Sequence, residues 1–93
     1  MIIGTLQVRL LLREARTLKD KRQVVLSIKD RLKQSFNVSV AEIEQMDQPR
    51  QVTLGIAMVS NETHPIKQTL GEIVNALKAH PIAEFVDSEI EMI

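Results

Sequence analysis

The sequence predicts an α+β domain with the element order β-α-β-β-α-β. Two kinds of apolar spacing predict it. Apolar residues alternate with polar ones over 2–12 and 51–60, as in strands that bury one face. They recur every three or four residues over 18–36 and 66–77, as in helices that pack one side on a core. With 93 residues, 44% hydrophobic and 26% charged, the chain fits one ordinary globular domain spanning residues 1–93.

The first half of the chain predicts a strand and a helix. Residues 13–16 form a loop between them, and Thr17, followed three residues later by Asp20, resembles a capping box that opens the helix. Asn37 tolerates the left-handed conformation that ends a helix, so we expect the helix to stop at about residue 36. The buried positions are Ile2, Leu6, Val8, Leu10 and Leu12 in the strand, and Leu18, Val25, Ile28, Leu32 and Phe36 in the helix.

The second half predicts two strands, a helix and a last strand. Over 38–45 the alternation breaks, because Glu42 and Glu44 would point inward, so we expect Ala41 and Ile43 to face the core instead. Either a bulge or a strand end that runs beyond the core would explain the break. Residues 47–50 are a turn that leads into the strand 51–60. The helix then begins at a cap, either Asn61 or Thr63, and ends at 80–81, before a strand over 82–92.

This order predicts the ferredoxin-like sandwich, a four-stranded antiparallel sheet with two helices on one face. The strands 2–12 and 51–60 should be central, and the strands 38–45 and 82–92 should lie at the edges.

Composition excludes several classes of site. Without cysteine the chain has no disulfide, thiolate nucleophile or Cys-ligated metal. His64 and His80 bracket the second helix, about 24 Å apart, too far to share a metal ion. We therefore expect no metal, no cofactor and no catalytic residue. No run is a signal peptide or a membrane span, so we expect a cytoplasmic protein without a membrane partner.

Charge is distributed unevenly along the chain. Residues 1–36 carry nine basic and three acidic side chains, a net +6, and the remaining 57 residues carry three basic and nine acidic ones, a net −6. On the first helix Lys19, Arg22, Lys29 and Lys33 fall on one stripe, interrupted by Leu26, while Asp20 and Asp30 point elsewhere. Such a stripe suits contacts with phosphates. It also suits a solvated face whose lysine stems cover apolar surface. Lys21 instead projects near the core, where it caps an edge or pairs with a carboxylate.

The outer face of the sheet offers a second surface. It carries no aromatic side chain on the central strands, which excludes the base stacking of RNA-recognition domains. A flat and moderately apolar patch predicts either a solvated face or a homodimer, in which Arg9 would meet Asp87, Glu89 and Glu91 across a two-fold axis. The candidate dimer residues are Ile3, Arg9, Leu11, Ala57 and Val59.

Three segments carry a family resemblance: Leu18-Lys19-Asp20-Lys21-Arg22, then 36–42 with the sequence Phe-Asn-Val-Ser-Val-Ala-Glu, then 54–61 with the sequence Leu-Gly-Ile-Ala-Met-Val-Ser-Asn. Together with Asp47 they resemble the YlxP-like family (DUF503), a bacterial domain of unknown function. The resemblance implies a ferredoxin-like fold, no established activity and a gene near translation genes. Many relatives carry an aromatic residue where this chain has Pro49, so a stacking role at that turn is not carried over.

Three functions follow as hypotheses. The first is a non-catalytic docking module whose basic helix binds structured RNA or the ribosome. The second is an adaptor that binds an acidic protein or a second copy of itself. The third is an acylphosphatase-like enzyme or small-ligand domain; the loop 13–16 argues against the enzyme, because it has no glycine and contains Glu14.

Overall fold

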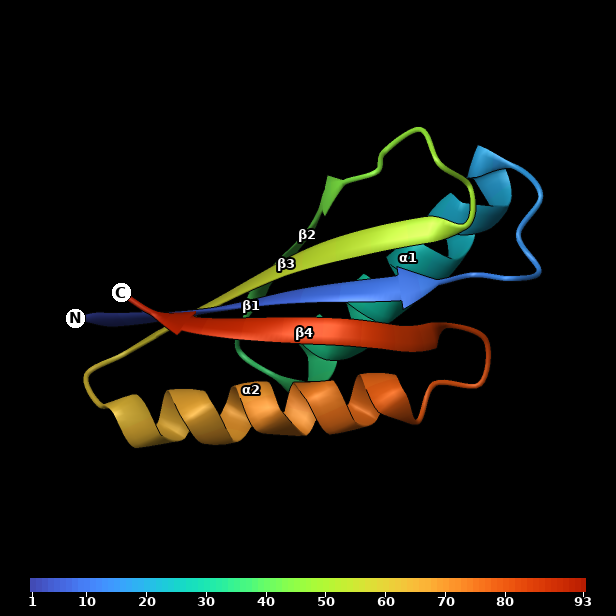
Figure 1. Cartoon of the computed structure of the whole chain (residues 1–93). Coiled ribbons are helices and arrows are strands. Elements are labelled where there is room, and N and C mark those ends of the chain that lie inside the picture. Colours follow the sequence, from blue (N-terminus) through green and yellow to red (C-terminus); the bar gives the residue numbers. More distant parts are fainter.

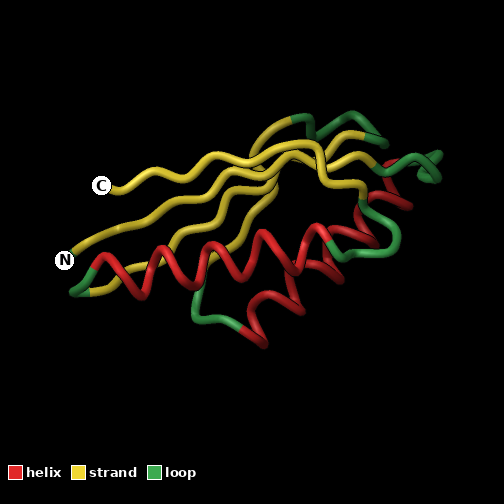
Figure 2. The backbone as a smooth tube through the Cα atoms, turned by 60° about the horizontal axis from the view of Figure 1, so that its bottom comes forward, coloured by secondary structure: helices red, strands yellow, loops and turns green.

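Four antiparallel strands form one sheet in the order β2-β3-β1-β4 in a computed structural model, which describes residues 1–93 (Figure 1). Both helices lie on one face of the sheet, and the other face carries no helix (Figure 2). This is the predicted α+β ferredoxin-like fold, with β1 and β3 central and β2 and β4 at the edges. The elements are β1 (Ile2–Leu11), α1 (Leu18–Ser35), β2 (Ser39–Glu44), β3 (Gln51–Ser60), α2 (Thr63–Lys78) and β4 (Glu84–Met92). Neither helix is both long and apolar enough to cross a bilayer.

The core lies between the sheet and the two helices. β1 pairs with β3 without interruption from Ile2 opposite Ser60 to Leu11 opposite Gln51, so the alternate residues of both strands face the helices. Most predicted core positions are buried, whereas Ile2, Leu18 and Phe36 are half-buried. Met58 and Val74 are also half-buried and pack against the core. The most completely buried side chains come from both central strands and from α2: Val8, Leu54, Ile66, Leu70 and Ile73.

The predicted capping box opens α1. The Thr17 side chain accepts the N–H of Asp20 at 3.1 Å, and Oδ2 of Asp20 accepts the N–H groups of Arg16 and Thr17 at 2.9 and 3.1 Å. These backbone donors, Arg16 first, hold the pKa of Asp20 below its usual value.

The predicted end of α1 at about residue 36 is confirmed, but the predicted left-handed Asn37 is wrong, as are the caps predicted for α2. Phe36 leaves the helix with an extended backbone (φ −136°) and packs its ring on the core. At the start of α2 the cap position is Glu62, not Asn61 or Thr63, and no side chain caps the helix. The Ser60 hydroxyl instead accepts the N–H of Glu62 at 3.2 Å.

The predicted bulge in β2 is present, but the side chains around it face the other way. The pairing with β3 shifts between Glu42 and Glu44. Ala41 and Ile43 are exposed, so the prediction that they face the core is wrong. Glu42 lies opposite the buried Leu54 and remains on the helix side of the sheet. A buried partner for its charge explains this position.

That partner is Lys21 of α1, whose side chain is 1% exposed. Its ammonium lies 2.8 Å from Oε2 of Glu42 in an ion-pair contact, and it donates hydrogen bonds to the carbonyl oxygens of Gln45 at 2.7 Å and Gln51 at 3.3 Å. Oε2 has no hydrogen-bond donor of its own, so its compensation is the charge of Lys21. Gln45 has a left-handed backbone (φ 60°), and Lys21 therefore fixes a strained connection between β2 and β3. The predicted pairing of Lys21 with a carboxylate is confirmed.

Candidate functional site

The four predicted phosphate-binding residues lie on one flank of α1. Lys19, Arg22 and Lys33 are exposed and Lys29 is half-buried. None of the four lies within 4.0 Å of a carboxylate; the ion pairs of the protein involve Arg9, Arg13 and Lys21. The stripe extends about 21 Å along the helix axis. Leu26, 57% exposed, adds an apolar side chain within it. The cationic surface therefore remains open to solvent.

Asp30 lies close to this stripe, so the prediction that it points elsewhere is wrong. By helical geometry it projects about 20° beyond Lys19, at the border of the stripe. Its carboxylate forms no ion pair and no hydrogen bond, and its side chain is exposed. It lowers the local positive potential without neutralising any one cation.

Arg9 of β1 and Arg13 of the loop after it are paired with acids of the same chain, whereas Arg16 of that loop forms no ion pair. Arg9 forms a two-pronged contact with Asp87 of β4, with its Nε 2.7 Å from Oδ1. Arg13 donates from its Nε to Glu84 at 2.5 Å. These arginines lower the pKa values of Asp87 and Glu84 below their usual range, chiefly through the side-chain hydrogen bonds. Acidic residues of β4 thus neutralise Arg9 and Arg13, whereas no acidic residue pairs with the cations of the α1 stripe.

This pairing corrects one detail of the predicted dimer face. Arg9 was expected to reach the acids of a second copy, but the antiparallel register places Asp87 beside it in the same chain. The patch is also divided, because Leu11 lies eight residues along β1 from Ile3, about 27 Å away, with polar side chains between them.

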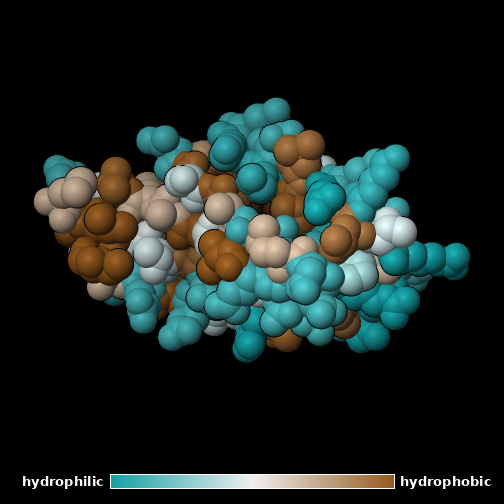
Figure 3. Space-filling model, turned by 90° about the horizontal axis from the view of Figure 1, so that it is seen from above, coloured by the Kyte–Doolittle hydropathy of each residue, from teal (hydrophilic) through white to brown (hydrophobic).

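Apolar side chains gather instead at the end of the molecule that carries both termini (Figure 3). Ile3 lies between Val59 of β3 and Ile93, with which it exchanges two backbone hydrogen bonds. Val59 is 58% exposed and Ile93 is 73% exposed. We call these three residues the terminal apolar row; Ala57 is half-buried in the next row.

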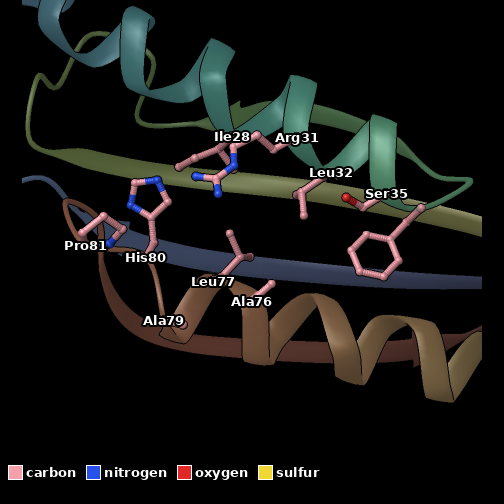
Figure 4. Close-up of a pocket in the computed structure, with 10 residues that line it drawn as sticks. Ile28, Arg31, Leu32, Ser35, Ala76, Leu77, Ala79, His80 and Pro81 are labelled. Carbon is pink, nitrogen blue, oxygen red and sulfur yellow. The ribbon is translucent and has the colours of Figure 1, made fainter.

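A groove between α1 and α2 was not identified from the sequence. Arg31 of α1 extends toward His80, which follows α2, at one end of this groove (Figure 4). Arg31 lies on the opposite side of the helix core stripe from Lys19, about 120° away by helical geometry. This offset could have shown from the sequence that Arg31 lies outside the cationic stripe. That α2 packs beside it and forms the other wall of a groove is known only from the tertiary structure.

His80 is held as a hydrogen-bond acceptor. Its Nδ1 accepts the N–H groups of Ile82 and Ala83 at 3.2 and 3.0 Å. Partial burial, and then the nearby positive charge of Arg31, lower the pKa of His80 below its usual value. His64, at the other end of α2, is exposed, and no three His, Asp or Glu side chains are close enough to hold a metal ion.

The lowered pKa of His80 predicts a pH-dependent stability. In neutral solution the imidazole is uncharged in both the folded and unfolded chain; as pH falls through about 6.5, the unfolded chain takes up a proton before the folded one does, so stability is lost. We expect the free energy of unfolding, measured with urea, to decrease from pH 7.5 to 5.5. His80→Asn, which keeps an acceptor near Nδ1, should reduce this decrease. An unchanged pH dependence in His80→Asn would contradict the assignment.

The comparisons with known proteins place the chain in a family. The model of the family described as "Protein of unknown function (DUF503)" matches residues 3–90. The chain belongs to the DUF503 family. A relative from Bacillus subtilis (strain 168), named "Uncharacterized protein YlxP", is 30% identical over 83 residues, which cover 89% of this chain and 90% of that protein. The predicted family resemblance is confirmed.

A solved structure supports the fold of this DUF503 domain. The de novo designed protein Foldit4 superposes with a TM-score of 0.54 over 99% of this chain and 94% of the designed one, at 16% sequence identity. At that identity the similarity concerns the fold alone. Neither the description of the DUF503 family nor the name of this relative specifies a ligand, partner or reaction. A proposal for function therefore depends on the surface of the molecule.

Proposed function

We propose that the protein is a non-catalytic docking module whose α1 flank binds the phosphate backbone of a structured RNA, such as ribosomal RNA. One observation carries the proposal: four cations without ion-pair partners form a line on α1, with Lys19, Arg22 and Lys33 exposed and Lys29 half-buried. Phosphate contacts of this kind position a protein on a helix without reading its sequence. Proteins that bind double-stranded RNA rely largely on its shape and on phosphate contacts.

The geometry of the stripe agrees with this target. Its length of about 21 Å allows several phosphates along a duplex groove to be contacted at once. The exposed stems of Lys19 and Lys33 at its two ends can adjust to the spacing of phosphates. Arg9 and Arg13 are already paired with acids of β4, so we expect counterion release from the line of unpaired cations on α1.

A filter-binding titration against ribosomal RNA fragments tests the proposal. The logarithm of the affinity should fall linearly with the logarithm of the salt concentration, because phosphates release counterions when they are bound. A pull-down from cell extract with and without nuclease separates RNA from an acidic protein as the partner. Absence of binding at low salt, or capture of a partner that survives nuclease treatment, would reject the RNA proposal.

A second candidate is self-association through the terminal apolar row of Ile3, Val59 and Ile93. The exposed Val59 and Ile93 lie side by side with Ile3 across three chain segments, and apolar surface of this kind favours a second copy. Light scattering should give the mass of a dimer, and Val59→Glu should give that of a monomer. Val86→Glu is the matched control, because Val86 is 56% exposed elsewhere, on β4. A monomeric mass for the unmodified protein at all concentrations would exclude this candidate.

A further inference from the structure

The groove between α1 and α2 has apolar walls, and at one end it carries a positive charge without a carboxylate to neutralise it. Its volume is about 230 Å³. Ile28 and Leu32 from α1 and Leu77 from α2 supply buried apolar surface, and Phe36 adds a half-buried ring. Arg31 and His80 supply the charged and titratable groups, and no carboxylate lines the groove.

The hydrogen bonds of His80 decide what its ring offers to the groove. Because Nδ1 accepts the N–H groups of Ile82 and Ala83, the neutral ring carries its proton on Nε2. Nε2–H has no protein acceptor, and the Arg31 guanidinium has neither an ion-pair nor a hydrogen-bond partner. Figure 4 shows Arg31 extending toward His80, so both donors lie at the same end of the groove.

We propose that this groove binds a small apolar carboxylate. The carboxylate would accept hydrogen bonds from Arg31 and from Nε2–H of His80, an arrangement that matches the planar fork of a guanidinium. The apolar part would lie against Leu32 and Leu77 between the helices. The volume is below the ~300–1,000 Å³ of pockets for drug-sized ligands, which limits the ligand to a short chain or a single ring. The proposal is independent of RNA binding, since Arg31 lies outside the cationic stripe.

The first experiment uses 3-phenylpropionate as the probe and its uncharged amide as the matched control. In two-dimensional NMR of the whole chain, the carboxylate should shift the backbone signals of Leu32, Leu77 and Ala79 with a Kd in the millimolar range or below. The amide should bind at least ~10-fold more weakly, because it lacks the charge-assisted hydrogen bonds. Equal binding of acid and amide, or no shifts at these positions at ~10 mM probe, would overturn the proposal.

Variants test the two donors separately. Arg31→Gln should weaken binding of the carboxylate at least ~10-fold, whereas Lys33→Gln, two residues further along the same helix, should leave it unchanged. His80→Asn removes the Nε2 donor while keeping an acceptor for the chain after α2, and it should also weaken binding. If Arg31→Gln binds the probe as tightly as the unmodified protein, the proposal is wrong. Arg31→Gln should leave RNA binding intact, so failure here and failure of the RNA proposal are separate results.

Discussion

Replacing Lys21 with methionine is expected to lower the free energy of unfolding by about 3–5 kcal/mol, the usual cost of removing one member of a buried ion pair. The ammonium is the charge that compensates Glu42, and it also supplies hydrogen bonds to Gln45 and Gln51. Methionine fills a similar volume but leaves the carboxylate without its compensating charge and two carbonyl oxygens without their donor. A domain of this size has a total stability of roughly 5–14 kcal/mol, so the loss is a large part of it.

Chemical denaturation followed by circular dichroism measures this effect. Lys33→Met, on the exposed flank of the same helix, is the control and should change stability by less than about 0.5 kcal/mol. In the double variant Lys21→Met/Glu42→Gln, part of the lost stability should return, because a buried amide costs less than a buried charge. A Lys21→Met protein as stable as the control would show that the pair does not hold β2 against α1.

Replacing Lys19, Arg22, Lys29 and Lys33 with glutamine is expected to weaken RNA binding by about a hundred- to a thousand-fold at ~0.1 M salt. The reason is counterion release: each phosphate contact contributes a slope of about 0.7–0.9 to the dependence of log affinity on log salt. Loss of four contacts should reduce that slope by roughly 3. Filter binding at several salt concentrations measures both quantities.

A second quadruple variant separates the stripe from overall charge. Arg16, Arg31, Lys67 and Lys78 are exposed and lie outside the stripe, so their replacement by glutamine removes the same formal charge. This control should retain most of the affinity and the salt slope. If both variants lose affinity equally, attraction arises from the net charge of the molecule, and α1 has no special role.

The sequence was informative wherever a residue's position depended on its neighbours along the chain. Period-2 and helical spacings placed most of the residues of the core, and Thr17 with Asp20 predicted the start of α1 correctly, since a capping box closes within four residues. It was misleading at Asn37 and at Asn61 or Thr63, where the cap depends on how Phe36 packs and on how the chain leaves β3.

β2 illustrates the same limit. The break in alternation predicted a bulge, which is present. Hydrophobicity alone also predicted that Ala41 and Ile43 face the core, whereas both are exposed. Glu42 stays on the core side because Lys21, twenty-one residues earlier in the chain, is buried opposite it. The sequence predicted that Lys21 would find a carboxylate but contained no signal for which one.

By itself the sequence determined the order of the elements, the antiparallel sheet and the line of cations on α1, because spacing along one chain segment decides which side of a strand or helix a residue occupies. Only the tertiary structure decided which charges stay free. Arg9 and Arg13 meet Asp87 and Glu84 because antiparallel pairing places β4 beside β1, whereas no acidic strand lies beside the outer flank of α1. The groove of Arg31 and His80 likewise exists because two helices pack on one sheet face and bring together residues 49 positions apart.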